Sequence, residues 1–96
     1  MAEHKSPLET KPIALSLTAD EALVLFGLLS RLVGERRGQD LVALVKHDAE
    51  LWALNSVLCS LEREVAQPFL EDHLILLDEA RARLAETNGG SWPWSP

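Results

Sequence analysis

The chain has 96 residues, of which 47% are hydrophobic and 25% are charged, and its formal net charge at pH 7 is -6. This length accommodates one domain with one modest core, and the composition is that of a globular protein rather than of a disordered one. The surplus acid lies in residues 48–96, which carry nine acids against three arginines. Because an acidic surface repels phosphate groups, the sequence argues against nucleic-acid and anionic-membrane binding and favours a protein partner with a basic surface.

The first twelve residues are polar and contain Pro7 and Pro12, so we expect a flexible N-terminal segment. They lack the apolar run of a signal peptide, and no apolar stretch reaches the roughly 18 residues that a membrane-spanning helix needs. The single cysteine, Cys59, has no partner for an internal disulfide and falls within a helical apolar pattern, which predicts a buried free thiol. Together these features favour the cytoplasm.

An alternating pattern follows. Ile13, Leu15 and Leu17 are separated by small residues, which is the periodicity of a short β-strand with one apolar face. A strand needs a partner, and the other candidate is LVALV at residues 41–45, which fits a helical start equally well. If residues 41–45 are helical, residues 13–17 must pair with a second copy of the protein.

A first helix is predicted from Thr18 to about Gly34, because Thr18 and Glu21 have the spacing of a capping box. Apolar side chains occupy most of its circumference. The main apolar face contains Ala22, Leu25, Phe26, Leu29, Leu32 and Val33, a second ridge contains Val24 and Leu28, and a narrow polar wedge contains Asp20, Gly27, Ser30 and Arg31. Either this helix is central and enclosed by the rest of the chain, or Val24 and Leu28 contact another subunit.

A second helix is predicted from Asp48 to Pro68, with an apolar seam of Leu51, Leu54, Leu58, Leu61 and Val65. A third is predicted from about Leu70 to Thr87, where Asn88 and Gly89 end it. The short QPF sequence between them predicts an antiparallel hairpin. On the third helix the expected buried stripe is Leu70, Leu74, Leu77, Ala80 and Leu84, which leaves Ile75 and Leu76 on exposed flanks.

The stretches LSLTADEALVLF, LEREVAQPF and LLDEARARL resemble, in this order, a group of small uncharacterised bacterial helical proteins. The resemblance covers residues 13–86. It implies a strand, a Thr-capped Leu-rich helix, a helix ending in a Pro-Phe turn and a final helix with Ala-Arg repeats, and it implies no activity.

Four polar residues are predicted to have structural roles. Arg81 falls inside the apolar stripe, where an unpaired charge costs about 3–5 kcal/mol, and the hairpin register places it level with Asn55. We expect a clamp between these two residues; the alternatives are an Arg81 side chain that reaches solvent and a contact with another subunit. The same register places Glu62 near His73, which predicts a salt link, and no nucleophile accompanies the pair. We therefore predict no catalysis.

The three histidines, His4, His47 and His73, lack the paired spacing and the cysteine companions of a metal site, so we predict neither a metal nor a cofactor. His47 precedes Asp48 and Glu50 and is better explained as part of a helix start.

The tail, residues 88–96, contains Trp92 and Trp94 in the sequence WPW. Burying two indole rings stabilises by about 10 kcal/mol, which offsets the roughly 8–16 kcal/mol needed to order eight residues. The tail is expected either to dock within its own assembly or to bind a partner.

The sequence thus predicts a mainly α protein with one domain at residues 13–87, formed by a short N-terminal strand and three helices, that assembles as a homodimer. The predicted function is that of a small acidic, non-catalytic protein-binding module of the inhibitor, antitoxin or immunity type. The alternative is a structural or assembly protein whose apolar surface serves only its own oligomer. The predicted interface residues are Ile13, Leu15, Leu17, Val24, Leu28, Ile75, Leu76, Trp92 and Trp94.

Overall fold

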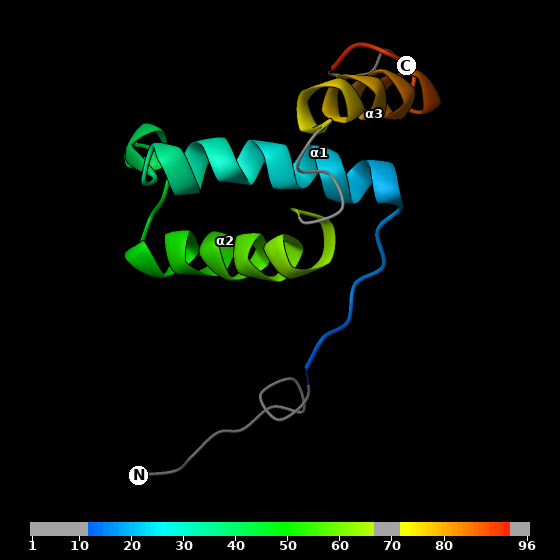
Figure 1. Ribbon diagram of the computed structural model, residues 1–96. Coiled ribbons are helices and arrows are strands. Elements are labelled where there is room, and N and C mark those ends of the chain that lie inside the picture. The colour runs from blue at the N-terminus through cyan, green and yellow to red at the C-terminus, as the bar shows by residue number, and fades with distance from the viewer. Residues whose placement is uncertain (1–11, 67–71, 93–96) are drawn as a thin grey trace, which may run out of the picture.

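The computed structural model describes residues 12–66 and 72–92, and this part of the chain is mainly helical, as predicted (Figure 1). The elements in chain order are α1 (Ala19–Leu29), the π-helical η2 (Ser30–Glu35), the 3-10 helix η3 (Gln39–Leu41), α2 (Asp48–Leu61), the π-helical η4 (Glu62–Ala66) and α3 (His73–Thr87). The predictions for residues 1–11, the QPF turn, Leu70 and Trp94 lie outside the described residues.

The predicted capping box begins α1. The Glu21 amide donates to Thr18 Oγ1 at 3.1 Å, and the Thr18 amide donates to Glu21 Oε1 at 2.8 Å. The helical path continues through η2 to Glu35, close to the predicted end at Gly34. At the start of α2, the Ala49 amide donates to His47 Nδ1 at 2.9 Å, which confirms His47 as part of a helix start.

The loop after η2 turns at two residues with positive φ, Arg37 at 54° and Gly38 at 73°. Gly38 donates its amide to the Leu32 carbonyl at 2.8 Å and lies against Leu51, where a Cβ would be only 3.2 Å from Leu51 Cδ2. A two-point ion pair from Arg36 to Asp40 closes the loop at 2.7 and 2.9 Å.

Residues 41–45 form neither a strand nor an α-helix. Leu41 ends η3, and the residues after it form turns in which the amides of Leu44 and Val45 both donate to the Leu41 carbonyl. Residues 12–18 run as an open segment away from the start of α1 and carry no regular secondary structure (Figure 1). The predicted strand is therefore not formed within the described single chain. Its pairing with a second copy stays a prediction.

The central element is α1, which lies between α2 and α3 (Figure 1). Both other helices pack on α1, and within the described ranges α2 and α3 do not pack on each other. The predicted hairpin of the second and third helices is therefore wrong. Of the two explanations for the apolar circumference of the first helix, the central position of α1 is confirmed, and α3 covers Val24. Leu28 remains 39% exposed, so its contact with another subunit stays a prediction.

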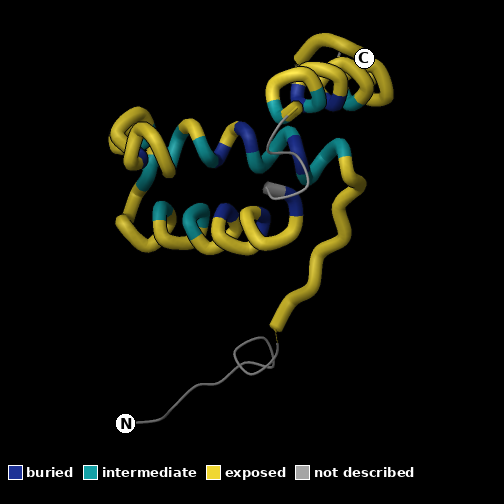
Figure 2. Tube along the Cα trace, in the orientation of Figure 1, coloured by how far each residue is buried: buried dark blue, intermediate teal, exposed yellow. Residues whose placement is uncertain are grey.

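The α1–α2 interface buries the main apolar face of α1 against the predicted seam of α2 (Figure 2). Leu29, Leu58, Leu61 and Val65 are buried there, and Ala22, Leu25, Phe26, Val33 and Leu54 pack around them. Both apolar faces were predicted correctly, but the partner of the seam is α1 rather than α3.

The α1–α3 interface uses the face of α1 that was predicted to be a polar wedge. Leu23, Leu77 and Ala80 form its buried centre, with Val24, Phe26 and Leu76 packed around them. Gly27 lets α3 approach closely, since a Cβ at this position would lie 3.0 Å from Leu77 Cδ2. The polar residue of this face, Asp20, accepts two hydrogen bonds from Arg83 on α3, each at 2.9 Å. Gly27 and the ion-paired Asp20 thus belong to the face of α1 on which α3 packs, and not to a face that is open to solvent.

On α3, Leu77 and Ala80 are buried as predicted, and Leu84 is half-buried. Leu74 was expected in the same stripe but is 76% exposed. The contacting stripe is rotated away from it towards His73, whose ring meets Phe26 edge-on with centroids 5.9 Å apart. The rotation follows from the helix on which α3 packs. Leu77 of α3 lies against Gly27 of α1, and α3 does not pack on the seam of α2.

Candidate interaction surface

The described surface keeps many large apolar side chains in contact with solvent. They are Ile13, Leu15, Leu17, Leu28, Val42, Leu44, Trp52, Val57, Leu74, Ile75 and Trp92. Six of them belong to the predicted interface set: Ile13, Leu15, Leu17, Leu28, Ile75 and Trp92. Two further members, Val24 and Leu76, are instead partly buried against the α1–α3 cluster, because α3 covers that side of α1.

The first hollow in this surface lies between α1 and α3 and is called the α1–α3 groove below. Its volume is about 670 Å³. Its lining residues come from α1, α3 and the segment after α3: Glu21, Val24, Arg81, Leu84, Ala85, Asn88, Gly90, Ser91 and Trp92. The groove therefore brings together Arg81, Val24 and Trp92, three residues that the sequence singled out separately.

The second hollow, of about 350 Å³, lies between the open N-terminal segment and the outer side of α2. Ile13, Leu15 and Leu17 form one wall, and Ser56, Val57, Ser60, Leu61 and Glu64 form the other. Ile13 and Leu15 are 70% and 81% exposed, so α2 covers little of their apolar surface. The alternating apolar residues thus remain accessible on one segment.

The third hollow, of about 340 Å³, is formed where the loop after η2 meets the start of α2. It contains Trp52, which is 70% exposed, beside Arg37 and Asn55. Trp52 was missed as a surface residue, although it falls off the seam spacing of Leu51 and Leu54 and could have been recognised by that mismatch.

Arg81 does not form the predicted clamp. Asn55 lies on α2 at the third hollow, whereas Arg81 lies on α3 and pairs with Asp78 at 3.3 Å. The Arg81 side chain is 45% exposed, so its charge reaches solvent, which was one of the two alternatives. The clamp fails because it required a hairpin of α2 and α3.

Glu62 and His73 also do not form the predicted salt link among the described residues. Glu62 is exposed at the start of η4, while the ring of His73 contacts Phe26. Cys59, which was expected to be buried, is exposed. Both errors follow from the same misplaced helix partner, since α3 was expected to lie beside Cys59 and Glu62 and packs on α1 instead.

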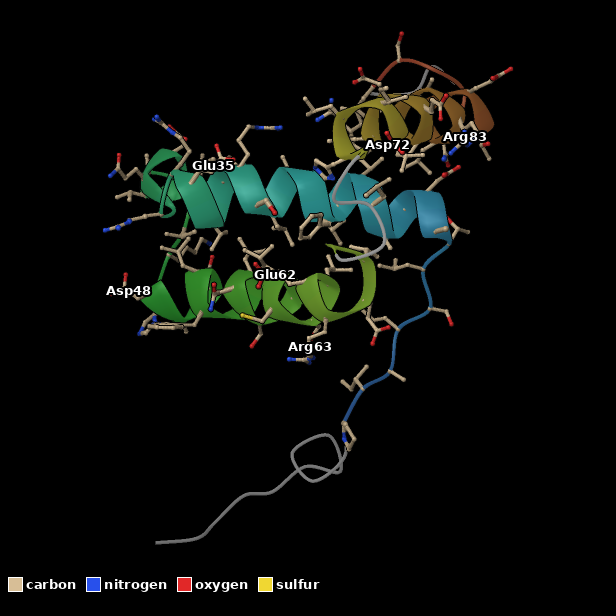
Figure 3. All side chains as sticks on the ribbon, in the orientation of Figure 1. Glu35, Asp48, Glu62, Arg63, Asp72 and Arg83 are labelled. Atoms are coloured by element: carbon tan, nitrogen blue, oxygen red, sulfur yellow. The ribbon has the colours of Figure 1, made fainter. Side chains whose placement is uncertain are left out.

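Two arginine–aspartate pairs dominate the electrostatics. The hydrogen bonds from Arg83 hold the pKa of Asp20 below its ordinary value, and those from Arg36 do the same for the pKa of Asp40. The Asp20–Arg83 pair joins α1 to α3 at the surface, and the Arg36–Asp40 pair joins the end of η2 to η3. Figure 3 shows the side chains of Asp48 and Glu62 on the helical segment formed by α2 and η4, which also carries Glu50 and Glu64.

Within residues 12–66 and 72–92, no helix combines the length and apolar content that crossing a membrane requires. The same ranges hold no cluster of three or more His, Cys, Asp or Glu side chains that could bind a metal ion. No protein-family model, curated protein or solved structure matches this chain. The resemblance to small bacterial helical proteins therefore stays a prediction.

Proposed function

We propose that this protein is a small, non-catalytic protein-binding module of the cytoplasm that acts as a homodimer. The observation that carries the proposal is the apolar segment at residues 13–17, whose Ile13, Leu15 and Leu17 side chains are 70%, 81% and 44% exposed. Soluble proteins rarely leave a contiguous apolar surface uncovered, and such surfaces usually mark a contact with another chain.

Residues 13–17 are suited to pairing with their own copy. In an antiparallel pair centred on Leu15, each Leu15 faces its counterpart and each Ile13 faces Leu17, so all three apolar side chains share one face. The described residues supply no backbone hydrogen bond to residues 13–17, which leaves their amides and carbonyls available for such a ladder. A twofold axis through Leu15 would place the apolar side chains of both copies on one face and would pair their free backbone groups.

The partner in this proposal is a protein with a basic surface. Asp48, Glu50, Glu62 and Glu64 lie on the single helical segment of α2 and η4, where Arg63 is the one base among residues 48–66. Charge complementarity of this kind accelerates association and selects partners of opposite sign. An inhibitor, antitoxin or immunity protein works by covering a partner in this way.

The homodimer is tested by light scattering over a range of protein concentrations. The wild-type protein should show the mass of a dimer, and Leu15→Lys should show that of a monomer, because the substitution places two like charges opposite each other in the pair. Ser16→Lys is the matched control, since it adds the same charge to the neighbouring exposed residue on the other face of the strand. A wild-type monomer at every concentration, or equal effects of the two substitutions, would overturn the strand-paired dimer.

The basic partner is tested by isolating the protein from its native cells in low salt and measuring the binding of the purified partner. The proposal expects a stoichiometric basic protein whose affinity falls with increasing salt and with Glu62→Gln/Glu64→Gln. The alternative is a structural or assembly protein, in which the exposed segment at residues 13–17 serves only self-association. A dimer that binds no other protein in low salt would support that alternative.

A further inference from the structure

We propose that the second hollow, between residues 13–17 and α2, is filled in the homodimer by residues 13–17 of the second copy, so that the outer side of α2 forms part of the dimer interface. This inference rests on the homodimer proposed above and adds to it a surface that strand pairing alone does not use. Three observations support it: the small size of the strand pair, the direction of its apolar side chains and the residues of α2 that line the hollow.

The strand pair is too small to hold two copies together by itself. Stable protein interfaces bury about 800 Å² on each partner and use about 20–30 residues a side, which is several times what residues 13–17 supply. A two-stranded pair is also only marginally stable in water unless a further layer, such as a helix, packs against it. Residues 12–18 are exposed along their whole length (Figure 2), and α2 with η4 forms the opposite wall of the hollow. This wall is therefore the layer on which the strand pair can pack.

The apolar face of the segment is already turned towards this wall. Ile13, Leu15 and Leu17 line the hollow, and Ala14 and Ser16 do not. In an antiparallel pair centred on Leu15, the same three side chains of the second copy lie on this face, with directly opposed Cβ atoms about 4.5–5.5 Å apart. Because the twofold axis is perpendicular to the pair, it also brings the second copy's α2 to this face. The apolar side chains of both copies then lie between the strand pair and the two α2 helices.

The α2 wall is suited to aliphatic side chains. Val57 is 36% exposed there, and Leu61 belongs to the buried α1–α2 cluster, so packing in the hollow extends an existing core. Ser56 and Ser60 are small, and serine hydroxyls in a helix can donate to a backbone carbonyl of the preceding turn instead of to water. Glu64 is the one charged residue among those that line the hollow.

The charge of the hollow favours the second copy over the basic partner. Residues 12–17 carry no charged side chain, which matches a wall that contains a single carboxylate. A basic surface would lose hydration in the hollow for one acidic contact, whereas Asp48, Glu50 and Glu62 lie on α2 and η4 outside its lining. The volume of about 350 Å³ is at the lower end of the range for sites that enclose small ligands, which fits a few aliphatic side chains.

The test is Val57→Asp, measured as the dimer dissociation constant by light scattering over a concentration series. We expect dimerisation to weaken by at least about tenfold, because each dimer would then bury two carboxylates without partners. Cys59→Asp is the matched control, since it adds the same charge at an exposed position of α2 that does not line the hollow. It should leave the dissociation constant within about twofold of that of the wild type.

Isotope-filtered NMR on a dimer of one labelled and one unlabelled copy tests the contact without a substitution, and it decides if Val57→Asp alters the far-UV circular dichroism. The Val57 methyl groups of the labelled copy should show NOEs to methyl groups of Ile13, Leu15 or Leu17 in the unlabelled copy. In a dimer that Leu15→Lys dissociates, absence of these NOEs or equal effects of Val57→Asp and Cys59→Asp would overturn this inference and leave the strand pair standing. A wild-type monomer, or a dimer that Leu15→Lys leaves intact, would overturn the proposed dimer and this inference together, so the two failures are distinguishable.

Discussion

Asp20 in the first turn of α1 and Arg83 near the end of α3 form a two-point ion pair across 63 residues of sequence, with both N–O distances at 2.9 Å. The pair fixes the end of α3 over the start of α1, on the face that also contains Gly27. Bidentate geometry makes it more specific than a single-point contact at the surface.

Asp20→Asn should lower the stability of the protein at neutral pH and should leave it nearly unchanged in strong acid. The folded-state pKa of Asp20 lies below its ordinary value of 3.8, first because of the hydrogen bonds from Arg83. A carboxylate with a lowered pKa stabilises the folded state above its unfolded pKa, and this stabilisation is lost as pH falls through the lowered value. Urea unfolding over a pH series should therefore show the wild-type and variant curves converging below about pH 4.

The control for this experiment is Asp40→Asn, because Arg36 also lowers the pKa of Asp40 and its contribution is lost in the same pH range. The Asp40 pair closes a loop and does not join α1 to α3. In double-mutant cycles with Arg83→Met, Asp20→Asn should show a coupling energy and Asp40→Asn should show none. Equal coupling in the two variants would contradict the docking role of Asp20.

Leu77→Ala should destabilise the protein by about 2–5 kcal/mol, because it opens a cavity between α1 and α3. Leu74→Ala removes the same atoms from a side chain that is 76% exposed, so its effect should stay within about 0.5 kcal/mol. Denaturant unfolding of the two variants measures both values. The reverse order would indicate that α3 presents a different face to the rest of the chain.

Two glycines of the first helical segment should respond in opposite ways. Gly27→Leu should destabilise by about 1–3 kcal/mol or more, since the site is already in close contact with Leu77. Gly34→Ala should stabilise by about 0.5–1 kcal/mol, because its Cβ would be 3.8 Å from Leu58 and the unfolded chain would lose freedom. Thermal unfolding distinguishes the signs, and destabilisation by Gly34→Ala would contradict the packing around η2.

Arg81→Met should change stability by less than about 0.5 kcal/mol, because the Arg81–Asp78 pair is a surface contact within one helix. Urea unfolding at low and high salt measures this directly. A loss of several kcal/mol would mean that Arg81 has a buried acceptor, as the hairpin arrangement required.

The helices of this protein could be predicted from local signals, but their partners could not. Thr18 and Glu21 predicted the start of α1 correctly because a capping box depends on only a few neighbouring residues. The seam of α2 was also correct, yet apolar spacing shows that Leu58 and Leu61 are buried without showing what covers them. The short connection predicts that α2 and α3 pack on each other, whereas both helices pack on α1.

The candidate site was predicted in its parts rather than as a whole. Trp92 and Arg81 were each singled out, but their common groove depends on the docking of α3 over Asp20 and Gly27. That docking had a signal in the sequence: a glycine inside a strong helix costs about 1 kcal/mol relative to alanine and usually has a packing reason. Gly27 belongs to the predicted polar wedge, and its contact with Leu77 shows that this part of the wedge is where α3 packs.

The position of α1 between its two neighbours also sets the order in which the fold opens. Because α2 and α3 are each supported by α1 and not by one another, α3 can detach while the α1–α2 pair persists. Opening α1, by contrast, uncovers both interfaces and amounts to global unfolding. In hydrogen exchange, the amides of Leu23 and Gly27 should therefore exchange among the slowest and those of α3 should exchange earlier, so that α1 is the last of the three α-helices in the described ranges to open.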